Sequence, residues 1–192
     1  MRLFVGIDIE EPIRKRITQF VDDLRKFAPE LRFVGPETYH VTLKFIGETN
    51  KLEEIRRALS DVRSAQFPID FRSYGFFPGA KNPRVFWIGI QAPVALQQLA
   101  TAVDNVVAPL GFERADSPLS PHLTLARSGS GRPRSLSGDR PNQKFQRIQE
   151  RLASAPEPEF GTMAAREFFL YESRLSPRGA QYFKVQSYEL HP

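Results

Sequence analysis

The tetrapeptide His-x-Thr-Leu occurs twice in the sequence, as residues 40–43 (His-Val-Thr-Leu) and 122–125 (His-Leu-Thr-Leu). Each copy lies in a short run of apolar and β-branched residues, a composition typical of a β-strand. Because alternate side chains of a strand share a face, the histidine and threonine of each copy point one way and the apolar residues point into a core. The sequence therefore predicts a fold that presents two such strands, each with one polar face.

The chemistry of the two copies suits a phosphate ester. An imidazole beside a hydroxyl, presented twice, supplies two proton-transfer groups and two hydrogen-bond donors. One copy alone would be typical of a structural histidine. Because the chain has only 3 histidines, two matching copies favour a functional pair, His40 and His122. The third histidine, His191, lies next to the C-terminus, and we expect no catalytic role for it.

Composition narrows the class of protein. The net charge of +5 and the pI of about 9.7 favour a polyanionic partner, although many basic proteins bind no nucleic acid. The absence of cysteine excludes disulfides and thiolate metal sites and fits a cytoplasmic protein, and three histidines make a multi-histidine zinc site improbable. No apolar run reaches eighteen residues and no signal-peptide pattern is present, so we expect no membrane association.

Hydrophobic periodicity and turn residues predict an alternation of strands and helices. The predicted strands are 3–7, 31–34, 40–46, 67–77, 85–90, 119–126, 163–175 and 182–190. The predicted helices are 10–27, one that follows the turn at 47–50, 93–108 and 144–152. Residues 128–142, rich in Gly, Ser, Pro and Arg, are predicted to be a flexible insert, with a solvated linker favoured over contact with a nucleic-acid backbone.

The two halves of the chain resemble each other. Residues 2–5 (Arg-Leu-Phe-Val) resemble residues 84–87 (Arg-Val-Phe-Trp) at a separation of 82 residues, which also separates His40 from His122. This spacing indicates an internal duplication with approximate halves 1–83 and 84–192. We therefore expect one bilobal α+β domain over residues 1–192, with two pseudo-symmetric lobes of antiparallel sheet and outer helices around a central groove.

Arg127 and the aromatic residues near the motifs are secondary candidates. Arg127 follows His122 by five residues, so an ideal strand would point it away, and a turn after Leu125 would be needed to return it to the groove, where it could pair with phosphate or stack on a base. For Phe45, Phe76 and Phe77 we expect core packing rather than stacking on a base. Tyr39 and Lys44 flank the first motif without a predicted role.

The motifs together resemble the two-histidine (2H) phosphoesterase superfamily, specifically the LigT-like RNA 2',3'-cyclic phosphodiesterases. The similar stretches are Arg-Leu-Phe-Val-Gly-Ile at residues 2–7, residues 40–47, Pro-Arg-Val-Phe-Trp at 83–87, residues 121–127 and Leu-Tyr-Glu-Ser-Arg-Leu-Ser at 170–176. They follow the order of the family and cover nearly the whole chain. The segment 128–142 is the least similar, which leaves substrate contacts directly beyond Arg127 undefined.

The resemblance implies roles for the motif residues. It implies that His40 is the proton donor, that His122 is the proton acceptor and that the product is a 2'-phosphomonoester. It agrees with Thr42 and Thr124 as hydrogen-bond donors to the phosphate oxygens, with Arg127 as a further phosphate ligand. It implies no metal or other cofactor, an RNA or nucleotide with a 2',3'-cyclic phosphate as substrate, and we expect a monomer.

Other functions fit the same motifs. The reverse reaction, 2'-5' RNA ligation, would use the same groove, and so would hydrolysis of 2',5'-oligonucleotides or of a small cyclic nucleotide. A non-enzymatic alternative is a module that binds phosphorylated RNA ends, which predicts binding without turnover. The two intact motifs favour an enzyme. The sequence does not indicate the physiological RNA.

Overall fold

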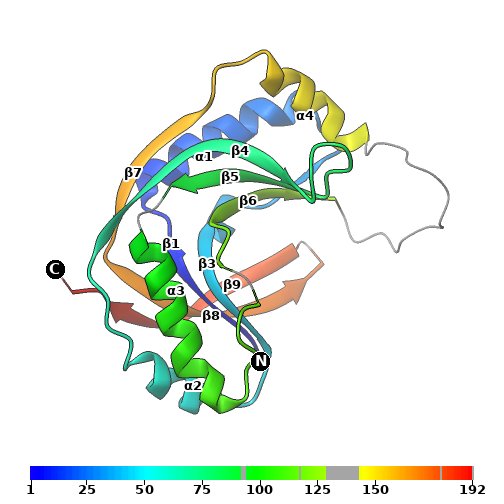
Figure 1. Cartoon of the computed structure of the whole chain (residues 1–192). Coiled ribbons are helices and arrows are strands. Elements are labelled where there is room, and N and C mark those ends of the chain that lie inside the picture. The colour runs from blue at the N-terminus through cyan, green and yellow to red at the C-terminus, as the bar shows by residue number, and fades with distance from the viewer. Residues whose placement is uncertain (92–93, 117, 129–142, 178, 192) are drawn as a thin grey trace.

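The computed structural model describes residues 1–91, 94–116, 118–128, 143–177 and 179–191. In these residues, two antiparallel sheets and four helices form an α+β fold (Figure 1). The helices are α1 (Glu11–Arg25), α2 (Leu52–Leu59), α3 (Val94–Val107) and α4 (Gln143–Ala153). Two 3₁₀ turns, η1 (Pro36–Thr38) and η2 (Ala108–Leu110), join elements of the fold. The predicted fold class is confirmed.

The strands divide into two sheets. Sheet A has four strands in the order β3 (His40–Glu48), β1 (Arg2–Asp8), β8 (Glu167–Ser176) and β9 (Gly179–Glu189). Sheet B has five strands in the order β2 (Arg32–Phe33), β6 (His122–Arg127), β5 (Val85–Gln91), β4 (Phe67–Phe77) and β7 (Glu159–Ala165). The two motif strands, β3 and β6, therefore belong to different sheets.

One predicted strand is wrong. The run 163–175 is not a single strand, because it contains the end of β7 in sheet B and most of β8 in sheet A. Only Arg166 separates the two strands, and its carbonyl accepts a hydrogen bond from Leu190 N at 2.7 Å. A one-residue break between two β-prone apolar runs leaves no change of periodicity, so the pattern could not indicate a crossing between sheets.

Each sheet takes strands from both halves of the chain. In sheet A, β1 from the first half pairs with β8 from the second half, and in sheet B, β4 from the first half lies between β5 and β7. Neither 1–83 nor 84–192 thus forms a sheet alone, and the duplication itself stays a prediction. Within the sheets, Gly6 of β1 lies opposite Thr42 and Trp87 of β5 lies opposite Thr124, so these two partners are 81 residues apart in the sequence, whereas the threonines are 82 apart.

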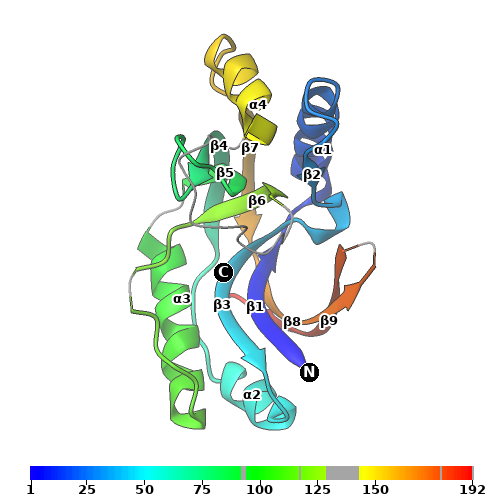
Figure 2. The same ribbon diagram turned by 90° about the vertical axis from the view of Figure 1, so that its right-hand side faces the viewer.

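The helices cover the outer faces of the sheets. α1 and α4 lie over sheet B, where Phe145 of α4 meets Phe76 of β4, and α2 and α3 lie beside sheet A (Figures 1 and 2). Their apolar faces and the helix-facing sides of both sheets form one continuous core. A second, small cluster of Phe4, Phe169 and Tyr171 lies on the opposite face of sheet A. Of the described helices, none is long and apolar enough to cross a membrane.

Candidate active site

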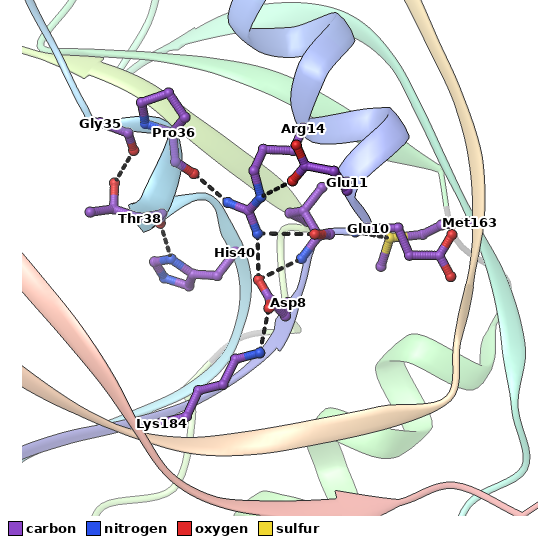
Figure 3. Close-up of polar contacts among 11 residues, drawn as sticks. Asp8, Glu10, Glu11, Arg14, Gly35, Pro36, Thr38, His40, Met163 and Lys184 are labelled. Atoms are coloured by element: carbon purple, nitrogen blue, oxygen red, sulfur yellow. Dashed lines mark hydrogen bonds and ion pairs between the residues drawn. The ribbon is translucent and has the colours of Figure 1, made fainter.

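Each motif histidine is the first residue of its strand and is held in the same way. The Nδ1 atom of His40 lies 2.7 Å from the carbonyl oxygen of Thr38 (Figure 3). The Nδ1 atom of His122 lies 2.8 Å from the carbonyl oxygen of Ser120. Because a carbonyl only accepts, Nδ1 carries the hydrogen in both contacts, and Nε2 is left to exchange a proton with a substrate.

The first motif strand is tied to the second by a short connection. β2 pairs with β6, the amide of Val34 donates to the carbonyl of Leu125 at 2.9 Å, and the chain then reaches His40 through η1. β3 and β6 consequently approach each other at the centre of the molecule (Figure 2). The charges of His122 and Arg127 both act on the His40 imidazole, so these three side chains share one electrostatic environment.

A bulge at matching positions of both strands determines which side chains reach the groove between the sheets. In β6, Thr124 pairs with Trp87 and Ala126 with Phe86, so Leu125 is an extra residue. Leu125 and Ala126 are both buried, and Arg127 returns to the face of Thr124, where its Nη2 lies 3.4 Å from Oγ1. Arg127 thus shares the face of Thr124, and a bulge rather than the turn considered in the sequence analysis returns it there.

The same bulge in β3 exposes an aromatic ring. Leu43 is the extra residue there, so Lys44 points inward to an ion pair with Asp104 of α3, and Phe45 points outward with 67% of its surface exposed. The Phe45 ring lies 6.2 Å from that of Phe4, which itself contacts His40. The expected core packing of Phe45 is therefore wrong. Phe45 occupies in sheet A the position that Arg127 occupies in sheet B.

The His40 imidazole lies on an aromatic floor formed by sheet A. Its ring centroid is 4.8 Å from Phe4 and 5.1 Å from Tyr182, and Phe4 stacks on Tyr171 at 4.8 Å. Burial is the main reason that the pKa of His40 falls to about 4. The Thr38 carbonyl and Asp8 raise this pKa, whereas electrostatic interactions with Arg127 and His122 lower it further. In the free protein His40 is neutral at pH 7.

Glycine allows β1 to approach His40 closely. Gly6 lies opposite Thr42, and a Cβ atom at Gly6 would stand 2.9 Å from the carbonyl oxygen of Val41 and 3.5 Å from the His40 ring. The first contact is with backbone, which cannot rotate away, so any side chain at Gly6 would displace the motif strand. The residue following Gly6 on the same face is Asp8, directly opposite His40 in the register.

Asp8 is the centre of an ionic network beside His40. It accepts hydrogen bonds from Arg14 at 2.7 Å, from Lys184 at 2.5 Å and from the amide of Ile9 at 2.8 Å (Figure 3). Burial raises the pKa of Asp8, but the hydrogen bonds from Lys184 and Ile9 and the charges of both cations outweigh it, so the pKa lies below its usual value. Asp8 is therefore ionised at neutral pH.

Arg14 links this network to the turn that orients His40. Besides Asp8, its guanidinium donates to the carbonyl oxygens of Ile9, at 2.9 Å, and of Pro36 in η1. η1 ends at Thr38, whose carbonyl accepts the Nδ1 hydrogen of His40. Arg14 thus connects α1, β1 and η1, and it fixes the carbonyl that fixes the imidazole.

His122 has aromatic neighbours of its own. Its ring is 5.0 Å from Phe77 and 6.3 Å from Trp87, so the expected core packing of Phe77 is wrong. Phe76 instead packs in the core against Phe86, as expected. The Trp87 indole lies flat over Gly75, where a Cβ atom would stand 2.1 Å from the ring, so only glycine leaves room for it.

The remaining candidates have structural contacts. Tyr39 is buried, and Lys44 also donates to the carbonyl of Glu113. His191 pairs through its backbone with residues 64–66. Residues 129–142 of the predicted insert lie outside the described residues. The sequence motifs do not include Asp8, Arg14 or Lys184, and the only sequence signal for them is that Asp8 directly follows the first predicted apolar strand.

Two anchored imidazoles, each with a threonine on its own strand face, define a site for paired proton transfer. Across the described residues, no three His, Cys, Asp or Glu side chains are grouped so as to hold a metal ion. The profile of the family described as LigT like Phosphoesterase matches residues 7–87 and again residues 88–182. The chain therefore belongs to the LigT-like phosphoesterase family.

Relatives match this chain over its whole length. A protein of Archaeoglobus fulgidus named RNA 2',3'-cyclic phosphodiesterase is 34% identical over 191 residues, which cover 98% of this chain and 100% of the relative. One of the same name from Methanothermobacter thermautotrophicus is 29% identical and covers 99% of both chains. The crystal structure of E. coli LigT complexed with 3'-AMP is 27% identical, with a TM-score of 0.76 over 98% of this chain and 97% of that chain.

Proposed function

We propose that this protein hydrolyses the 2',3'-cyclic phosphate ends of RNA to 2'-phosphomonoesters. The observation that carries the proposal is the pair of imidazoles at matched strand starts, each with Nδ1 on a carbonyl and Nε2 free for proton transfer. Full-length relatives with this named activity support the substrate class. The predicted cytoplasmic location and monomeric state stay predictions.

The reaction requires an acid and a base on opposite sides of phosphorus. In the proposed mechanism Nε2 of His122 takes a proton from water as its oxygen bonds to phosphorus. The bond from phosphorus to the 3'-oxygen breaks, and His40 donates a proton to that oxygen. Water thus ends as the fourth oxygen of a 2'-phosphate, and the ribose regains a 3'-hydroxyl.

The bound phosphate favours the protonated form of His40 that the reaction requires. Burial lowers the pKa of His40 to about 4, so the imidazolium is scarce in the free protein at pH 7. An anionic phosphate against the ring favours the charged form and raises this pKa, because opposite charges attract strongly in a site with little water. The proton donor therefore forms with the substrate in place.

Thr42, Thr124 and Arg127 are proposed to hold the non-bridging oxygens. Each threonine shares a strand face with its histidine, and the Arg127 guanidinium lies beside the Thr124 hydroxyl. Donors aimed at oxygens that gain charge in the transition state lower the barrier more than they stabilise bound substrate. The pseudo-symmetric threonines suit a phosphate approached from two sides.

The proposal is tested with purified protein and an RNA oligonucleotide that ends in a 2',3'-cyclic phosphate. In the presence of EDTA we expect a product heavier by one water, with the phosphate at the 2'-position, detected by mass analysis and by comparison with authentic isomers. The His40→Ala and His122→Ala variants should each lose at least about 10³-fold in kcat, while His191→Ala should not.

Full turnover by His122→Ala, with circular dichroism like that of the wild type, would sink the two-histidine mechanism. Incubation with a second RNA that bears a 5'-hydroxyl tests the alternative reaction. Joined product with a 2',5' linkage in place of hydrolysis would identify a ligase. Binding of the RNA without any change in mass would identify an end-binding module.

A further inference from the structure

A pocket of about 710 Å³ adjoins His40, and no residue of β6 lines it. Its size lies within the range of about 300–1,000 Å³ that is typical of ligand sites. η1 forms one wall and the edge strand β9 forms the other (Figure 3). The lining combines the aromatic side chains of Tyr171 and Tyr182 with the cations Arg14 and Lys184, and with Asp8 and Glu37.

The charges of this pocket suit a single phosphodiester rather than a polyanion. Two cations and two carboxylates line it, so their formal charges balance. Lys184 is the cation best placed to contact a ligand, since 47% of its side chain is exposed. It bonds Asp8 and lies 4.0 Å from the centre of the Phe169 ring, which leaves donor capacity on the ammonium group.

The geometry of the reaction places the body of the RNA on the side of His40. In an in-line displacement the attacking water and the leaving oxygen occupy opposite sides of phosphorus. The leaving 3'-oxygen belongs to the ribose, and in the proposed mechanism it faces His40. The ribose and the chain that continues from its 5'-carbon therefore extend toward His40 and the pocket, whereas the water enters beside His122.

We propose that this pocket binds the nucleotide that precedes the cyclic-phosphate nucleotide in RNA, with Lys184 contacting the phosphodiester that joins the two. The half-buried Tyr182 ring, on the same strand face as Lys184, provides a surface on which its base stacks. The inference rests on the proposed function and identifies its substrate as an oligonucleotide rather than a free cyclic nucleotide. The protein is thereby selective for RNA ends over mononucleotides.

The test compares a dinucleotide that ends in a 2',3'-cyclic phosphate with the corresponding cyclic mononucleotide. The wild type should open the dinucleotide with a kcat/KM at least about tenfold higher, since one charge-assisted contact of this kind is worth about a factor of ten. Lys184→Gln should remove most of that preference, because it should lower kcat/KM about tenfold more for the dinucleotide than for the mononucleotide. Lys26→Gln, which removes an exposed charge at the end of α1, should preserve it.

A binding measurement separates the subsite from the reaction. Titration with a dinucleotide that carries a 3'-phosphomonoester, against the matching mononucleotide, should show the same tenfold difference in Kd and the same loss in Lys184→Gln. Equal handling of dinucleotide and mononucleotide by the wild type, or an unchanged preference in Lys184→Gln, would overturn the inference. The wild type could instead open neither substrate but bind the dinucleotide more tightly, with that preference lost in Lys184→Gln. This result would support the subsite and refute the proposed function.

Discussion

The two motif strands place the same unit in different surroundings. In each, a histidine at the strand start bonds a carbonyl two residues earlier, a threonine shares its face, and a bulge follows the leucine. His40, however, lies on the aromatic floor and is backed by the Asp8 network, whereas His122 contacts Phe77 and Trp87 and has Arg127 on its own strand. Equal local geometry with unequal surroundings lets two imidazoles take unequal roles in one reaction.

The largest effect that probes this comparison concerns the threonines. Replacing Thr42 or Thr124 by Val keeps the shape and removes the hydroxyl, so each variant should lose about 10²-fold in kcat with little change in KM. Steady-state kinetics on the cyclic-phosphate dinucleotide measure both constants. The Thr→Ser variants should retain most activity. If Val at only one of the two positions is harmful, the oxygens are held from one side of the groove, and the proposed symmetry of phosphate binding is wrong.

The buried His40 should make the folded protein less stable at acidic pH. The pKa of His40 is lowered from 6.5 to about 4 on folding, so between these values the unfolded chain binds the extra proton. The free energy of unfolding is therefore highest above pH 6.5 and falls as the pH approaches 4. The contribution of His40 to this fall is about 2 kcal/mol after allowance for partial access to water. Urea unfolding at pH 7 and at pH 4.5 measures the loss.

The His40→Asn variant is the matched control for that measurement, since all carboxyl groups are retained. Its free energy of unfolding should fall less between the two pH values, by about the amount assigned to His40. An identical fall in the wild type and the variant would mean that the imidazole is not desolvated by folding. The burial of His40 on the aromatic floor would then make no contribution to the pH dependence of stability.

A smaller effect is expected from the clamp that only the His40 side possesses. Arg14→Met removes the contacts to Asp8, Ile9 and Pro36, so η1 loosens and the carbonyl of Thr38 no longer fixes the imidazole. We expect about a tenfold loss in kcat together with an altered pH–rate profile, as misplacement of a proton donor impairs its transfer step. Lys15→Met, an exposed position on the same helix, should change neither. A loss of stability with an unchanged pH profile would assign Arg14 a purely structural role.

The sequence predicted those parts of the site that depend on residues close together in the chain. The strand period placed His40 beside Thr42, and the helical spacings located the four helices. The bulge that returns Arg127 and exposes Phe45 depends on pairing with β5 and β1, which no period within one strand reports. The network of Asp8, Arg14 and Lys184 joins residues up to 176 positions apart, so only the folded chain brings it together.

The exchange of strands between the two halves could not be predicted for the same reason, because it depends on pairing between strands that lie far apart in the sequence. The sequence resemblance of the halves indicates repeated units, but it does not specify which sheet receives β4 or β8. That choice follows from the crossing at Arg166, where one residue separates strands of different sheets. The exchange brings Tyr171, Tyr182 and Lys184 from the end of the chain against His40 near its start. Its consequence is that the second half of the chain forms the surroundings of the first histidine.

The division of labour between the two histidines is tested most directly with a substrate whose leaving group needs no acid. A nucleoside 2',3'-cyclic phosphate with sulfur in place of the 3'-oxygen releases a thiolate, which is stable without a proton because a thiol has a pKa of about 8.5. His40→Ala should open this substrate within about tenfold of the wild type, while His122→Ala should stay inactive. Rescue of His122→Ala instead of His40→Ala would reverse the assignment, and rescue of neither would contradict acid catalysis by either imidazole.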